Sequence, residues 1–358
     1  MKKIVGTIAA IALAASSAFA GANFGMGFNR AFFTPFAYDG EAKADISTSW
    51  GKAPRIGASF SAASEDVGVV ADVKFDGGNV AVNDNAYIWV KPASWLKIQI
   101  GQSFDDTLRG NACFGTWDWL RPGNILNDDI TFARLSRVDA LYTSVTGAIV
   151  SLDPIEGLHI AASLQPGYGA PVAAETVFQN AQVQAGYTIA DVMQIKAQWI
   201  GWAKTVNAAV ALKAVENMTL EAGVYIPTAS AERADGKLGH KTKIGAFWGM
   251  PVGPVALKVN AEVALAANDT ETTDVKAGAG IDFDCGNGLG IGADVVYGQE
   301  FEKDGDSKAG IAISAWVSKS IPNGMFGVAF LCAMNDKLNT YDASDFTFAV
   351  PFKVNVGF

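Results

Sequence analysis

The sequence predicts an all-β fold, because apolar side chains recur at every second position in segment after segment. The last segment shows this most clearly, with apolar side chains at Phe348, Val350, Phe352, Val354, Val356 and Phe358. This period is typical of a strand with one face in an apolar medium. The chain is 50% hydrophobic and 18% charged, yet no apolar run is long enough for a membrane-spanning helix. Together these features predict a transmembrane antiparallel up-and-down β-barrel, in which alternation disperses the apolar residues.

The start of the chain has the pattern of a secretory signal peptide. Lys2 and Lys3 precede an apolar run over residues 4–15, and the small-residue motif Ala18-Phe19-Ala20 follows. We therefore expect residues 1–20 to be removed and residues 21–358 to form the barrel. Export without a spanning helix leaves the periplasm, the outer membrane or the medium as destinations.

Charged residues keep to one parity of the alternating segments, which predicts a charged inner wall. A lysine or arginine on the lipid face costs about 2–4 kcal/mol at the membrane midplane, so charges should face inward. Trp316 is an exception among the aromatic residues, because its parity points it inward as well. The residues expected on the inner wall are Lys74, Lys97, Lys196, Lys243, Lys258, Lys276, Lys353, Asp72, Glu221, Glu262, Asp282 and Asp294.

The alternating segments predict about eighteen strands, with about sixteen as the alternative. The first strand is expected near residues 24–29, and a polar loop containing Pro35, Asp39-Gly40 and Pro54 should follow it. The last strand carries Pro351, which cannot donate a hydrogen bond to a neighbouring strand. We therefore expect a local bulge at Pro351.

Residues 104–137 form the longest interruption of the strand pattern. A connection of this length is usually functional or disordered, and Trp117 and Trp119 argue against disorder. The segment either folds into the lumen and narrows the pore or lies at the surface as a loop of mixed charge. The candidate constriction residues are Asp105, Asp106, Arg109, Asp118, Arg121, Asp128, Asp129 and Arg134.

Several motifs resemble those of bacterial outer-membrane barrels. The end of the chain, with Phe352, Val354, Val356 and a terminal Phe358, resembles their closing strand, and this resemblance implies recognition by the barrel assembly machinery. The segment GFNRAFFTP at residues 27–35, the turn WVKPASWLK at 89–97 and LRG at 108–110 resemble a spirochaetal family of porin-like outer-membrane proteins. This second resemblance implies a surface protein of the bacterial outer membrane and implies no particular substrate.

The sequence offers little support for catalysis, cofactors or nucleic-acid binding. Acidic residues outnumber basic ones, 36 to 27, which disfavours nucleic acid as a partner. The three cysteines are widely spaced and form neither a disulfide framework nor a zinc pattern. The two histidines, His159 and His240, lack a neighbouring triad pattern in the sequence. We therefore expect no enzymatic activity and no cofactor.

These features predict an outer-membrane porin that forms a passive aqueous channel for small hydrophilic solutes and ions. A barrel of this size leaves a water-filled channel unless something plugs it. The alternative is a structural surface antigen or adhesin on a closed barrel. The expected partners are outer-membrane lipid, the assembly machinery and the solutes, and a homotrimer remains open.

Overall fold

The computed structural model describes residues 23–25, 29–38, 42–47, 56–76, 79–110, 138–143, 146–164, 173–228, 241–265, 272–301, 308–334 and 346–357. The predicted signal peptide at residues 1–20 and the terminal Phe358 lie outside these ranges. The boundary predicted at residue 21 therefore stays a prediction.

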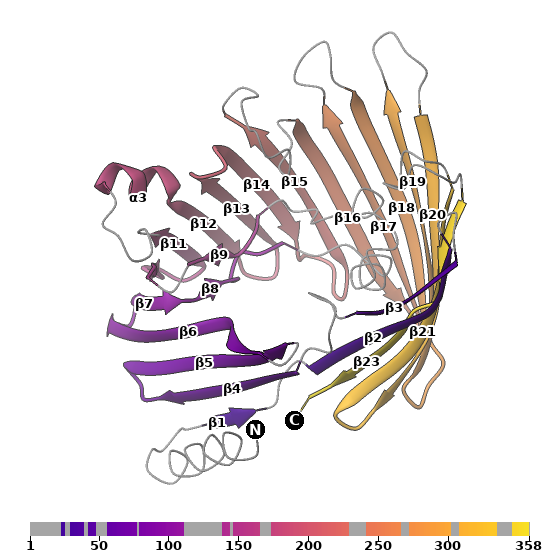
Figure 1. The fold of residues 1–358 in the computed structure, drawn as a ribbon. Coiled ribbons are helices and arrows are strands. Elements are labelled where there is room, and N and C mark those ends of the chain that lie inside the picture. The colour runs from indigo at the N-terminus through magenta and orange to yellow at the C-terminus, as the bar shows by residue number, and fades with distance from the viewer. Residues whose placement is uncertain are drawn as a thin grey trace.

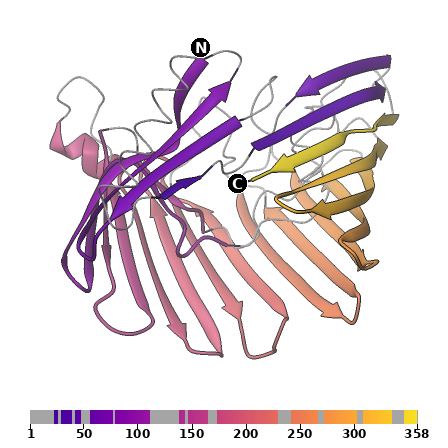
Figure 2. The same ribbon diagram turned by 90° about the horizontal axis from the view of Figure 1, so that it is seen from below.

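One antiparallel sheet of 21 strand segments makes up almost all of the described chain. Figure 1 shows these strands as a single curved wall, and Figure 2 shows the same wall from below as it bends around. The strands of the first third are β1 (Asn23–Gly25), β2 (Asn29–Tyr38), β3 (Ala42–Ser47), β4 (Ile56–Ala63), β5 (Val67–Asp76), β6 (Asn79–Ala93) and β7 (Leu96–Gln102).

The later strands follow one another as hairpins, and each pairs with the next along the chain. They are β10 (Ala148–Leu152), β11 (Leu158–Leu164), β12 (Gln182–Ile189), β13 (Met193–Ile200), β14 (Thr205–Leu212), β15 (Thr219–Pro227), β16 (Thr242–Val252), β17 (Val255–Leu265), β18 (Thr273–Asp284), β19 (Leu289–Phe301), β20 (Lys308–Ile321), β21 (Gly324–Met334), β22 (Phe346–Ala349) and β23 (Phe352–Val356). A separate two-stranded ribbon consists of β8 (Phe104–Asp105) and β9 (Leu141–Tyr142).

The predicted fold class is confirmed, with 21 strand segments in the sheet where about eighteen strands are predicted. The prediction of a polar loop directly after the first strand is wrong, however. Residues 29–38 continue as β2, which forms a hairpin with the additional strand β3. The register between these strands shifts between Thr34 and Ala37, which marks a bulge. Phe33 and Phe36 are consequently both exposed, although strict alternation would put them on opposite faces.

The second strand of the chain pairs with the last one. Strand β2 pairs with β23 from Asn29 opposite Val356 to Phe33 opposite Phe352, and β1 pairs with β4. Among the described residues, β23 thus continues into β2 and β3, whereas β1 continues into β4 and β5. The ladder is interrupted at Pro351, between β22 and β23, as predicted. There the carbonyl of Pro351 still accepts from the amide of Ala329.

The two faces of the wall differ in chemistry, as the alternation predicts. On β17, Leu257, Val259 and Leu265 are exposed on the convex face, whereas Asn260 and Glu262 are buried on the concave face. The same division holds on β12 and β13, where Val183 and Trp199 are exposed and Gln184 and Lys196 are buried. The concave face is therefore the polar inner wall.

Short turns join many of the hairpins and require glycine or asparagine. The turn between β18 and β19 places Gly286, Asn287 and Gly288 at positive φ, where a β-carbon is usually strained. One helix, α3 (Ala174–Asn180), lies among the described residues. No helix in the described ranges is both long and apolar enough to span a membrane.

Candidate functional site

Two segments between β7 and β10 leave the wall and form an inward strap, defined as residues 103–110 and 138–143. Strands β7 and β10 pair directly, so the strap is an excursion between neighbouring strands. Within it Phe104 pairs with Tyr142 and Asp105 with Leu141. The amide of Gly110 donates to the carbonyl of Val138 at 2.9 Å. Strand β9 lies beside β11 and β12 in Figure 1.

Leu108 anchors the strap to the inner wall through apolar contact. Its side chain is 1% exposed and packs with Val138 and with Ala209 of β14. A β-carbon placed on Gly186 of β12 would lie 2.4 Å from Leu108 Cδ2, so a larger residue at this position would force the leucine side chain to shift. Because Gly186 and Ala209 lie on the concave face, the described strap lies on the luminal side of the wall.

Two glutamines of the inner wall hold the strap backbone by hydrogen bonds. Gln198 accepts from the amide of Asp139 and donates to the carbonyl of the same residue, both at 3.0 Å. Gln182 accepts from the amide of Tyr142 at 3.3 Å. Side chains of the wall therefore supply hydrogen bonds to strap amides and carbonyls that lose contact with water on docking.

Asp105 is the polar centre of the contact between strap and wall. One oxygen, Oδ2, accepts from the Ser151 hydroxyl at 3.0 Å and lies 3.2 Å from His159 Nε2. The other ring nitrogen of His159 lies 2.8 Å from Asp153 Oδ1, at the turn between β10 and β11. His159 thus lies between a strap carboxylate and a turn carboxylate.

The environment of Asp105 favours its charged form. Burial alone would raise the pKa of this carboxyl, but the contact with His159 and hydrogen bonds from Thr107 outweigh burial and hold the pKa well below its usual range. Loss of any of these partners would leave a poorly compensated buried carboxylate.

The carboxylates around His159 come from other parts of the fold. His159 does have carboxylate neighbours, but they come from the strap and from a turn rather than from its own strand. The Ser151 hydroxyl donates to Asp105, not to the imidazole. This is not the nucleophile–base arrangement of a catalytic triad.

The structure brings some of the predicted constriction residues together and leaves others undescribed. Asp105 is buried against the wall, whereas Asp106 and Arg109 are exposed. Arg109 Nε lies 3.8 Å from Asp139 Oδ1, an exposed pair for which about 0–1 kcal/mol is typical. The remaining candidates, Asp118, Arg121, Asp128, Asp129 and Arg134, lie outside the described residues. The anchoring roles of Leu108, Gln182, Gln198 and His159 were missed, since nothing local in the sequence indicates which residues meet the strap.

The inner wall carries charges at the predicted positions, and several form pairs across strands. Lys196 of β13 contacts Glu221 of β15, and both side chains are only 2% exposed. Lys258 of β17 contacts Asp282 of β18 nearer the short turns. Lys241, just before β16, pairs with Asp274 of β18 at 2.7 Å. Within the described ranges, no group of three or more His, Cys, Asp or Glu could hold a metal ion.

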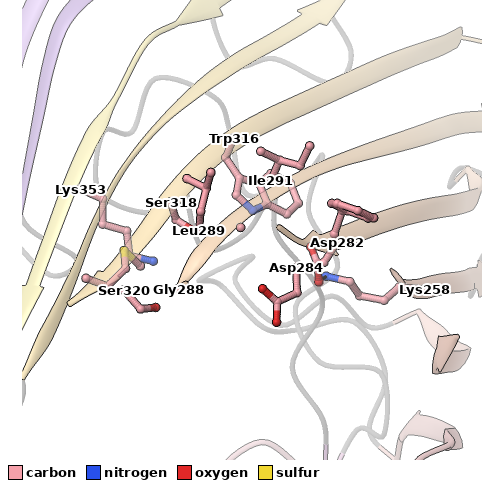
Figure 3. A pocket seen from close by; sticks show the side chains of 13 residues that line it. Lys258, Asp282, Asp284, Gly288, Leu289, Ile291, Trp316, Ser318, Ser320 and Lys353 are labelled. Carbon is pink, nitrogen blue, oxygen red and sulfur yellow. Dashed lines mark ion pairs between the residues drawn. The ribbon is translucent and has the colours of Figure 1, made fainter. Parts of the chain in front are cut away.

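A hollow opens on the concave face beside the Lys258–Asp282 pair. It has a volume of about 460 Å³ and lies over strands β17 to β21 and β23. Figure 3 shows Trp316 and the serines Ser318 and Ser320 at this hollow, with Lys353 at its edge. Trp316 thus points inward, as its parity predicts.

Solved structures with this fold are outer-membrane proteins of bacteria. The chain is similar to Acinetobacter baumannii OccAB4, with 8% identity, a TM-score of 0.60, and 95% of this chain and 99% of that chain covered. It is similar to Pseudomonas aeruginosa OpdL, with 10% identity, a TM-score of 0.58, and 94% and 98% covered. It is also similar to OmpT, an outer membrane protein of Vibrio cholerae, with 10% identity, a TM-score of 0.50, and 94% and 97% covered.

These similarities establish the fold rather than a family. No protein-family model matches the chain, and no curated protein matches it by sequence. The structural neighbours cover nearly the whole chain and are bacterial outer-membrane β-barrel proteins. The predicted β-barrel fold is therefore confirmed.

Proposed function

We propose that the protein is an outer-membrane porin, a passive aqueous channel for small hydrophilic solutes and ions. One observation carries the proposal: the concave wall is lined by paired charges and amides, while the convex wall is aliphatic and aromatic. A polar interior within a lipid-facing barrel is what a water-filled path requires. The proposal includes the resemblance to a spirochaetal family of porin-like outer-membrane proteins.

The inward strap is proposed to narrow this channel. Its anchors on β11, β12, β13 and β14 place its two described ends on the luminal wall. Residues 111–137 connect these ends, so Asp118, Arg121, Asp128, Asp129 and Arg134 join Asp105, Asp106 and Arg109 in the proposed constriction. Charged groups at a narrow point set the electric field that permeating ions experience.

The proposal also covers the partners of the protein. Lipid would contact the convex face, and the strand with Phe352, Val354, Val356 and Phe358 would be recognised by the barrel assembly machinery. Catalysis, a cofactor and nucleic acid are not part of the proposal. A homotrimer is one assembly that cross-linking in native membranes would reveal.

Single-channel recording in planar bilayers tests this function. Purified protein should give stepwise current increments, and its reversal potential in a salt gradient should report ion preference. A variant with residues 111–128 replaced by a short Gly-Ser linker should fold and conduct more. A protein that inserts as a heat-modifiable barrel without any conductance would instead support the surface antigen or adhesin.

A further inference from the structure

The hollow over β17 to β21 contains an aromatic platform that the channel function does not require. Trp316 of β20 stands directly opposite Gly292 of β19. A β-carbon on Gly292 would lie 2.3 Å from Cζ2 and 2.5 Å from Cε2 of the indole. The indole therefore covers the luminal side of this glycine, and any larger residue would displace it.

The platform packs against the wall and also lines the hollow. Trp316 packs against the buried cluster that contains Ala312, Ala329 and Leu331. Its side chain also lines the hollow, where its neighbours are small residues such as Gly290 and Ser318 (Figure 3). The wall thus presents an apolar ring at the floor of a polar space.

The cation of an ion pair lies over the platform. Lys258 contacts Asp282, and Lys258 Nζ lies 5.8 Å from the centre of the Trp316 ring. The ammonium supplies donors and the carboxylate supplies acceptors, and their charges offset each other. The Ser318 and Ser320 hydroxyls, which can do both, lie on the same inward row of β20.

We propose that this hollow is a saccharide-binding subsite, a proposal that deepens the channel function and rests on it. The face of a pyranose ring is covered with C–H groups and would lie on the part of the Trp316 ring that lines the hollow. Each hydroxyl of a sugar both donates and accepts, so adjacent hydroxyls can donate to Asp282 and accept from Lys258. A volume of about 460 Å³ is within the range of small-molecule sites.

The charge of the hollow favours a neutral solute over an ion. Lys258 is already paired with Asp282, and Asp284 and Lys353 bring one further charge of each sign to the lining. A free carboxylate would compete with Asp282 for the ammonium, and a free cation would meet the ammonium beside the indole. A polyol pairs with both partners without separating them.

Isothermal titration calorimetry on the full-length protein in detergent tests the subsite. Maltose and glucose are the probes, and gluconate and arginine are the charged comparators. Maltose should bind saturably and more tightly than either charged compound. Trp316→Ala should weaken maltose binding about tenfold, or about 1.4 kcal/mol. Trp316→Phe, which keeps an aromatic face, should lose less.

Matched variants separate the platform from general damage. Trp199→Ala removes an indole from the exposed convex face of β13 and should leave maltose binding unchanged. Gly292→Val keeps Trp316, but the valine side chain would displace the indole from its position over residue 292. This variant should therefore weaken maltose binding as Trp316→Ala does. Asp282→Asn removes the acceptor charge and should weaken binding as well. These two variants carry the test if Trp316→Ala does not fold.

The outcomes distinguish the subsite from the channel. The subsite is refuted if maltose gives no saturable heat, if Trp316→Ala, Gly292→Val and Asp282→Asn all bind like the unmodified protein, or if gluconate binds more tightly than maltose. Conductance without maltose binding would support the channel function and refute the subsite. Maltose binding without conductance would support the subsite and refute the channel function.

Discussion

Truncation of Leu108 to alanine should loosen the inward strap without unfolding the barrel. Leu108 is almost fully buried between Val138, Ala209 and the glycine at position 186. Removing its side chain leaves a void over Gly186 that the rigid wall cannot fill. The barrel ladders do not involve Leu108, so the loss should be confined to strap docking.

The size of the effect follows from burial and from the anchors that remain. Leucine-to-alanine changes in compact cores cost about 2–5 kcal/mol, and a strap held on one side belongs at the lower end, about 2–3 kcal/mol. That corresponds to an increase of about 30- to 150-fold in the undocked population. The two hydrogen bonds to Gln198, each worth about 0.5–1.5 kcal/mol, keep the strap mostly docked.

Limited proteolysis reads this population directly. Trypsin cleavage after Arg109 requires the strap to open, because the Gly110 amide is held by Val138. When opening is fast, the initial cleavage rate follows the open population, so it should rise by a similar factor. Channel current should also become noisier and larger on average. Leu257→Ala, which truncates an exposed leucine on the convex face, serves as the control.

The reasoning fails if Leu108→Ala folds as a barrel and is cleaved after Arg109 at the unmodified rate. Equal rates in Leu108→Ala and Leu257→Ala would mean that the leucine contributes nothing to docking. A variant that no longer forms the heat-modifiable barrel would refute the independence of wall and strap.

Three further predictions concern the wall, the strap and the last strand. Lys196→Met should lower the free energy of unfolding by about 3–5 kcal/mol in urea titrations, because it leaves Glu221 buried without its cation; Lys196→Met with Glu221→Leu should recover most of this loss. Docking of the strap lowers the pKa of Asp105, so the ionised carboxylate should stabilise the docked strap fully above the ordinary carboxyl pKa of about 3.9 and progressively less as the pH falls toward the lowered pKa. The current noise of the unmodified channel should therefore rise in acid. An equal rise of current noise in Asp105→Asn would contradict this. Val354→Asp, on the exposed convex face, should strongly reduce the amount of protein recovered in the outer membrane, whereas Asn355→Asp on the neighbouring inward position should be tolerated; equal recovery of both variants would overturn the facing of β23.

The strands could be predicted because alternation is a local signal. Spacing alone predicts which face of the sheet Leu257, Val259 and Glu262 occupy, and their exposure in the structure agrees with that prediction. The strand β2 was missed because its bulge between Thr34 and Ala37 breaks the period of two. Pro35 in this stretch also resembles a loop signal.

The site could be predicted only in part, because its contacts depend on register and curvature. The long segment was identified from its length and composition. That Leu108 lies over the glycine at position 186, or that Asp105 meets His159, depends on which strands the curved wall brings beneath the strap. No spacing rule links residues from different strands in this way. Trp316 was the exception, since its parity alone placed it inward.

The pairing of β2 with β23 has a consequence for the order of folding. Phe33 lies near the start of the chain and Phe352 near its end, so their pairing closes a very long loop. The hairpins between them need only short loops, whose closure costs less entropy. The seam should therefore form last, after the neighbouring hairpins have assembled and drawn the two ends together. A chain that stalls before release of its C-terminus would hold an open sheet with two unpaired edges, and its lifetime would depend on how well those edges are shielded.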